Sequence, residues 1–134
     1  MKKVISLLLL VTLLLTLASC GDSLPKEKRA AVDNAVTDLE NAVFSVGKQL
    51  DELVSYNGMY DSYDADYEYF DGKYMSLVGI KRELKATYDE KAKTFTEEDA
   101  DAFVSEHLEP IATAEALATE LRNYLDNIKK EMSK

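Results

Sequence analysis

The chain has 134 residues, of which 25 are acidic and 16 basic, with one cysteine, one histidine and five glycines. This length allows one domain, and the net charge of −9 argues against nucleic acid as a partner, because phosphate binding requires clustered lysine and arginine. One cysteine excludes an internal disulfide, one histidine excludes a zinc site built from several imidazoles, and the low glycine and proline content favours long helices over a turn-rich β fold.

The first residues have the organisation of an export signal. Lys2 and Lys3 form a short positive region, and the apolar run from Val4 to Leu17 is interrupted only by hydroxyl side chains. This run is too short to span a hydrocarbon core of about 30 Å comfortably. It has the length and the flanks of the apolar core of a signal peptide.

The segment Leu17-Ala18-Ser19-Cys20 follows directly, with an aliphatic residue, two small residues and the cysteine. It resembles the lipobox of bacterial lipoproteins. The resemblance implies that the Cys20 thiol receives a diacylglyceryl group and that a peptidase cuts between Ser19 and Cys20, after which the new amino group is often acylated. Two or three acyl chains hold a protein stably on a bilayer. The alternative is an ordinary secretory signal followed by an incidental cysteine.

These features predict a signal peptide over residues 1–19, a lipidated tether over residues 20–24 and a helical domain over residues 25–134. The membrane is then a partner through the lipid on Cys20, and the protein lies on the extracytoplasmic side of a bacterial envelope membrane. Without the two lysines of the leader the balance is 25 acidic to 14 basic residues, a net charge of −11.

Apolar residues at alternating steps of four and three predict a first helix after the tether. Residues with this spacing form a seam, the row of side chains by which one helix packs on another. The first seam consists of Val32, Val36, Leu39, Val43, Val46, Leu50 and Leu53. Asn57 or Gly58 then ends the helix in a left-handed conformation.

A second seam predicts a second helix. It consists of Tyr60, Tyr63, Tyr67, Phe70, Tyr74, Leu77, Leu84 and Tyr88. Lys81 occupies one seam position, where its aliphatic stem can cover the core while its ammonium group remains in water.

The third helix has the clearest start, because Thr96 and Asp99 form a variant of the capping box. Phe95 is placed to pack on Ala100 just inside this start. The third seam consists of Val104, Leu108, Ile111, Ala114, Ala118, Leu121, Leu125, Ile128 and Met132. Pro110 lies inside the pattern and removes a backbone donor, so we expect the third helix to be kinked near Pro110, or briefly broken near residues 107–109.

Three seams with short connections predict an all-α fold, an antiparallel up-down-up three-helix bundle or coiled coil of long helices. The alternative is a shorter unit that pairs with a second copy.

A segment rich in tyrosine and acidic residues opens the second helix. Its candidate ligand surface consists of Tyr63, Asp64, Asp66, Tyr67, Glu68 and Tyr69. A calcium loop that starts at Asp64 would need glycine at position 69 and glutamate at position 75, where the chain has Tyr69 and Met75, so we expect no metal site. A surface for a ligand or a cationic partner is one interpretation, and seam tyrosines beside solvated acids are the other.

Small residues recur at every seventh position of the second helix, opposite its seam. This small-residue stripe consists of Gly58, Ala65, Gly72, Gly79 and Ala86. Because glycine destabilises a helix interior by about 1 kcal/mol, the stripe predicts a contact groove for a partner helix or a second copy. The alternative is a bend or coincidence.

Catalytic residues are not indicated by the sequence. His107 is expected at the edge of the core, and a di-iron motif fails because position 104, where glutamate is needed, is Val104. We therefore expect no enzymatic activity and no cofactor, and a non-enzymatic binding or scaffolding role with an envelope protein or a second copy as partner. The alternative is a lipoprotein that captures a cation or small polar solute through the Tyr/Asp-rich segment.

Overall fold

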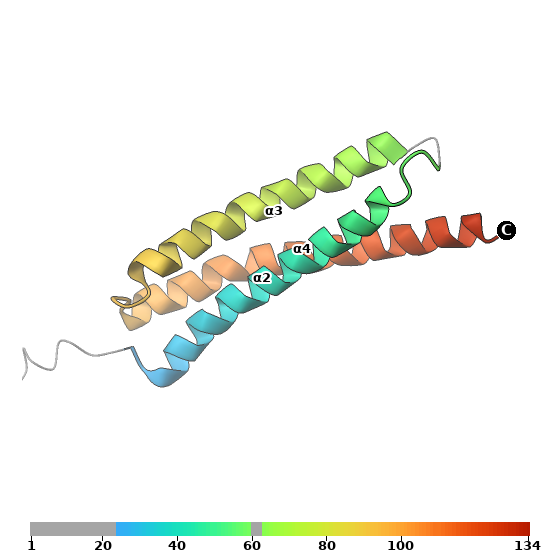
Figure 1. Ribbon diagram of the computed structural model, residues 1–134. Coiled ribbons are helices and arrows are strands. Elements are labelled where there is room, and N and C mark those ends of the chain that lie inside the picture. Colours follow the sequence, from blue (N-terminus) through green and yellow to red (C-terminus); the bar gives the residue numbers. More distant parts are fainter. Residues whose placement is uncertain (1–23, 60–62) are drawn as a thin grey trace, which may run out of the picture.

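The computed structural model describes residues 24–59 and 63–134. These residues form three helices, α2 (Lys26–Val54), α3 (Tyr63–Lys91) and α4 (Glu97–Met132), and contain no strand. Successive helices run in opposite directions, so that α2, α3 and α4 form an up-down-up bundle (Figure 1). The predicted all-α three-helix bundle is therefore confirmed.

The α2 seam forms one side of the core. Six of its seven predicted residues are buried, and Val36 is half-buried. Alternating steps of four and three keep these side chains on one face of the helix. The main core joins the seam residues from Leu39 to Leu53 to residues of α4 such as Leu121 and Leu125. The helix stops at Val54, and its C-cap Ser55 has a right-handed conformation, so the prediction that Asn57 or Gly58 ends this helix is wrong. Gly58 lies in the turn that follows and has the left-handed φ of +75°.

Helix α3 buries fewer side chains than α2 or α4. Its buried residues are Tyr63, Phe70 and Leu77, while Tyr67, Tyr74 and Leu84 are half-buried against the main core. Helix α2 packs most extensively against α4, and α3 packs least against α4. The bundle is therefore closed between α2 and α4 and more open between α3 and α4.

The predicted capping box at the start of α4 is present. The Asp99 N–H donates to Thr96 Oγ1 at 3.1 Å, and the Thr96 N–H donates to Asp99 Oδ2 at 2.9 Å. The backbone and hydroxyl donors of Thr96 favour the charged carboxylate and lower the pKa of Asp99 below its ordinary value of 3.8. Phe95 and Ala100 are buried in one small cluster, as the sequence predicts.

Helix α4 continues through Pro110 without interruption. The alternative of a short break near residues 107–109 is therefore wrong. A proline inside a helix leaves one carbonyl without its usual donor. The nearest buried residues on the two sides of Pro110 are His107 and Ala114.

The seam of α4 differs from the predicted one both before Pro110 and at the end of the helix. Leu108 is 62 % exposed, Met132 is also exposed, and His107 is buried with 1 % of its surface accessible. The prediction of an edge histidine is wrong because a strict alternation of four and three, counted back from Ala114, leads through Ile111 to His107 and not to Leu108. The Nδ1–H of His107 donates to the Phe103 carbonyl oxygen at 2.7 Å, which gives the buried imidazole a backbone partner.

Candidate functional site

The predicted lipid attachment site at Cys20 and the cleavage site between Ser19 and Cys20 lie outside the described residues. The described chain begins at Leu24, which is buried in a small cluster with Phe95 and Phe103. This cluster lies at the end of the bundle where α2 starts and where α3 connects to α4 (Figure 1). Leu24, the last residue of the predicted tether, is therefore packed onto the bundle just before α2 begins.

Two tyrosines of the candidate ligand surface belong to the core. Tyr63 is buried, and its ring stacks on that of Tyr67 with 5.8 Å between centroids and 16° between planes. The charge of Asp71, followed by burial, disfavours the phenolate and raises the pKa of Tyr67 above 10.0. These two side chains pack against the main core and stabilise the first turns of α3.

Two further members of the surface are engaged with α4. Asp66 accepts a hydrogen bond from the Tyr124 hydroxyl. The Tyr69 hydroxyl donates to Glu120 Oε1 at 2.9 Å, and the Lys73 ammonium group lies 4.0 Å from the centroid of the Tyr69 ring. The hydrogen bond with Tyr69 and then that with Glu120 favour the ammonium form and raise the pKa of Lys73 above 10.5.

The remaining two acids, Asp64 and Glu68, are exposed. The six residues therefore divide into a pair in the core, a pair that contacts α4 and a pair in solvent, and the structure does not bring them together. In residues 24–59 and 63–134, no group of three histidine, cysteine, aspartate or glutamate side chains is close enough to hold a metal ion.

The small-residue stripe has no partner in the bundle. Ala65, Gly72 and Ala86 are exposed and Gly79 is half-buried, and a Cβ atom built at Gly72 or Gly79 would have no neighbour within 4 Å. Gly58 lies in the turn before α3, so its inclusion in the helical stripe is wrong. The stripe thus consists of four residues on the surface of α3.

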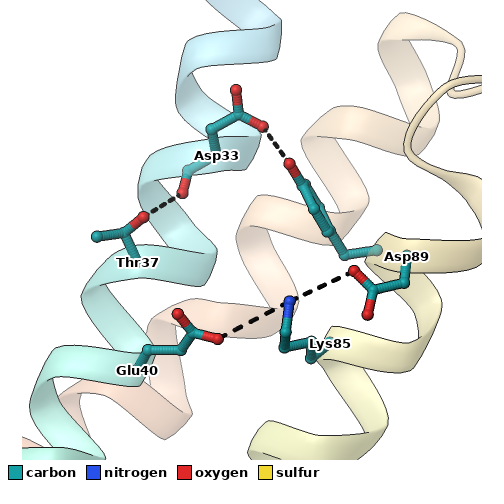
Figure 2. Close-up of polar contacts among 6 residues, drawn as sticks. Asp33, Thr37, Glu40, Lys85 and Asp89 are labelled. Carbon is teal, nitrogen blue, oxygen red and sulfur yellow. Dashed lines mark hydrogen bonds and ion pairs between the residues drawn. The ribbon is translucent and has the colours of Figure 1, made fainter.

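Polar contacts join α3 to α2 near the tether end of the bundle. The Tyr88 hydroxyl donates to Asp33 Oδ1 at 2.8 Å, and Lys85 lies between Glu40 at 3.9 Å and Asp89 at 3.3 Å (Figure 2). The hydrogen bond with Asp33 is the main cause that raises the pKa of Tyr88 above 10.0. The Tyr88–Asp33 and Lys85–Glu40 pairs join α3 to α2 and stabilise the packing of these two helices.

A groove lies between α3 and α4, and we call it the α3–α4 groove. Its volume is about 510 Å³, and Leu77 and Leu117 form its apolar floor. Ile80, Ala112 and Ala116 line its walls, and the ion pair of Lys73 with Glu120 lies at one end. The residues that line the groove are Lys73, Ser76, Leu77, Ile80, Glu109, Ala112, Thr113, Ala116, Leu117 and Glu120.

The residues from α4 were missed by the sequence analysis. Ala112 and Ala116 are one turn apart and outside the seam, so they form a row of small side chains on the α4 surface. That spacing was the available signal. A row of small side chains with this spacing allows a neighbouring helix to approach α4 closely. In the structure, α3 leaves the row uncovered.

Two other hollows are more polar. One of about 480 Å³ between α2 and α4 is lined by Asp38, Glu115 and Arg122 among others. The other, of about 540 Å³, lies at the far end of the bundle and includes Asp66 and Tyr124. Of these three hollows, the α3–α4 groove is the most apolar.

Comparison with known proteins finds no matching family model, no matching curated protein and no matching solved structure. In the part of the chain that the structure describes, none of the helices combines the length and the apolar character needed to cross a membrane.

Proposed function

We propose that the protein is a lipid-anchored lipoprotein of the bacterial cell envelope that acts as a non-enzymatic binding or scaffolding module. The observation that carries the proposal is the sequence Leu17-Ala18-Ser19-Cys20 immediately before a packed helical bundle. Residues 21–25 are the whole connection between Cys20 and the first residue of α2, and such a connection spans at most roughly 20 Å. A lipid on Cys20 would therefore hold the start of α2 near the bilayer.

The placement of the polar side chains supports a binding role over a catalytic one. Tyr88, Lys85 and Tyr69 pair with residues of neighbouring helices, and they do not converge on a cavity. The open feature is an apolar groove with small walls, which suits contact with another surface. The bundle thus presents an apolar groove between α3 and α4.

Metabolic labelling with a palmitate analogue tests the anchor. Wild-type protein should incorporate the label, and intact mass should show loss of residues 1–19 and addition of acyl chains. Cys20→Ser should remove the label, because no other cysteine is present, while the neighbouring substitution Ser23→Ala should leave it unchanged. Equal labelling of the wild type and Cys20→Ser would refute the lipoprotein assignment.

A second candidate is capture of a small polar solute or cation at the far end of the bundle. The observation that favours it is the hollow of about 540 Å³, whose lining includes the polar residues Asp66, Tyr124 and Asn127. A solute that binds there should raise the melting temperature of the wild type, with a smaller rise in Asp66→Asn. Equal rises in the two proteins, or none in the wild type, would contradict this candidate.

A further inference from the structure

The α3–α4 groove has the dimensions of a helix-binding site. On α4 it extends from Glu109 to Glu120, about 16 Å at 1.5 Å per residue, or three turns of a helix. Its floor is formed by Leu77 and Leu117, and its α4 wall by the exposed small residue Ala116 and its neighbour one turn earlier. Small side chains at a helix contact allow the axes to approach closely.

The two ends of the groove differ in charge. At one end Lys73 pairs with Glu120 at 3.3 Å. At the other end Glu109 is exposed, with Glu106 one turn before it on α4 and Glu83 one turn after the groove residue Ile80 on α3. In the described part of the chain no ion pair engages these three carboxylates. The groove therefore has an apolar floor and one acidic end.

We propose that the α3–α4 groove binds an amphipathic helix of a partner protein, which lies between α3 and α4 as a fourth helix and places basic residues against Glu83, Glu106 and Glu109. Helices bound in apolar grooves are anchored by apolar residues spaced by three and four positions, and complementary charge sets their orientation. This inference rests on the proposed binding function and names the class of partner.

A second copy of the chain fits the groove less well. Residues 20–134 carry a net charge of −11, and a copy docked on this face would bring like charges together, which disfavours association. The same negative charge attracts a basic partner and favours its association.

The small-residue stripe borders this groove. Gly72 precedes the groove residue Ser76 by four positions and Gly79 follows it by three, so both are neighbours of Ser76 on the α3 surface. The open space around both glycines leaves room for the side chains of a docked helix.

A synthetic peptide tests the proposal directly. The probe is a fluorescent three-heptad helix with leucine and alanine on one face and lysine beside them, and the control peptide carries glutamate in place of lysine. The full chain is placed in nanodiscs of zwitterionic phosphatidylcholine, and empty nanodiscs give the background. Fluorescence anisotropy should show binding of the lysine peptide at least about tenfold tighter than binding of the glutamate peptide, and added salt should reduce the difference.

Two variants locate the binding. Ala116→Leu fills the groove at an exposed helical position and should weaken peptide binding by about tenfold or more. The matched control Ala31→Leu, on the exposed surface of α2, should leave the affinity unchanged. Glu83→Lys combined with Glu109→Lys should reverse the preference between the two peptides. Circular dichroism of each variant verifies that it remains helical.

Three results would overturn the proposal. The first is that the wild type does not bind the lysine peptide. The second is that Ala116→Leu and Ala31→Leu bind it equally well. The third is that sedimentation shows self-association of the wild type through a contact that Ala116→Leu removes. The last result would assign the groove to a second copy. The same peptide titration is repeated on the purified chain in buffer without nanodiscs. A failure of Cys20 labelling would then refute the anchor and leave this measurement valid.

Discussion

Leu121 and Leu108 provide a controlled test of the bundle, because both lie on α4 and one substitution removes the same atoms from each. Leu121 is fully buried in the main core, whereas Leu108 is 62 % exposed. Leu121→Ala should lower the free energy of unfolding by about 2–5 kcal/mol, since it loses apolar burial and leaves a cavity. Leu108→Ala should change it by less than about 0.5 kcal/mol, as is usual for a surface position.

Urea unfolding followed by far-ultraviolet circular dichroism measures both changes. The midpoint should move to lower urea concentration for Leu121→Ala with an unchanged slope, which indicates that stability and not the denatured state has changed. A loss of about 2 kcal/mol is a large part of the 5–15 kcal/mol that stabilises a typical domain. Equal losses for Leu121→Ala and Leu108→Ala, or negligible losses for both, would refute the packing of α4 described above.

Three further predictions concern substitutions at single positions. Gly72→Ala should raise the free energy of unfolding by about 0.5–1 kcal/mol in urea titrations, and Gly47→Ala should raise it less, because its Cβ would lie 2.9 Å from the Tyr74 hydroxyl oxygen. The lowered pKa of Asp99 contributes stability above pH 3.8 that is lost as the pH falls through the folded-state pKa, so Asp99→Asn should reduce the loss of stability on acidification. The raised pKa of Tyr88 contributes stability below pH 10.0 that is lost at higher pH, so Tyr88→Phe should reduce the loss of stability in alkaline thermal melts.

Most of the fold follows from spacing that is visible in the sequence. The capping box at Thr96 and the seam of α2 are local patterns, and both occur as predicted. The predicted α4 seam is wrong at Leu108 and at Met132, which are both exposed. Hydrophobicity favours Leu108 over His107, although the alternation of four and three favours the histidine. Burial of His107 depends on its backbone hydrogen bond to Phe103, which hydropathy does not describe.

The candidate site was less predictable than the fold. Asp64 and Asp66 are close in sequence, but residues two apart on a helix point in different directions, so they do not form one surface. The α3–α4 groove was missed because seams identify which residues face the core and not how closely two helices approach. That distance depends on residues outside the seams, such as Ala112 and Ala116.

The shallow burial of α3 has a consequence for amide hydrogen exchange. Helix α3 contributes three buried residues, whereas α2 contributes seven and α4 contributes nine. Segments with few buried contacts open locally at a lower free energy than the whole domain. The amides of α3 should therefore exchange through detachment of α3 from a persistent α2–α4 pair, while the slowest amides of α2 and α4 exchange only through global unfolding. A helix bound in the groove would contact both α3 and α4 and oppose the detachment of α3. Binding of such a helix should therefore slow the exchange of the α3 amides.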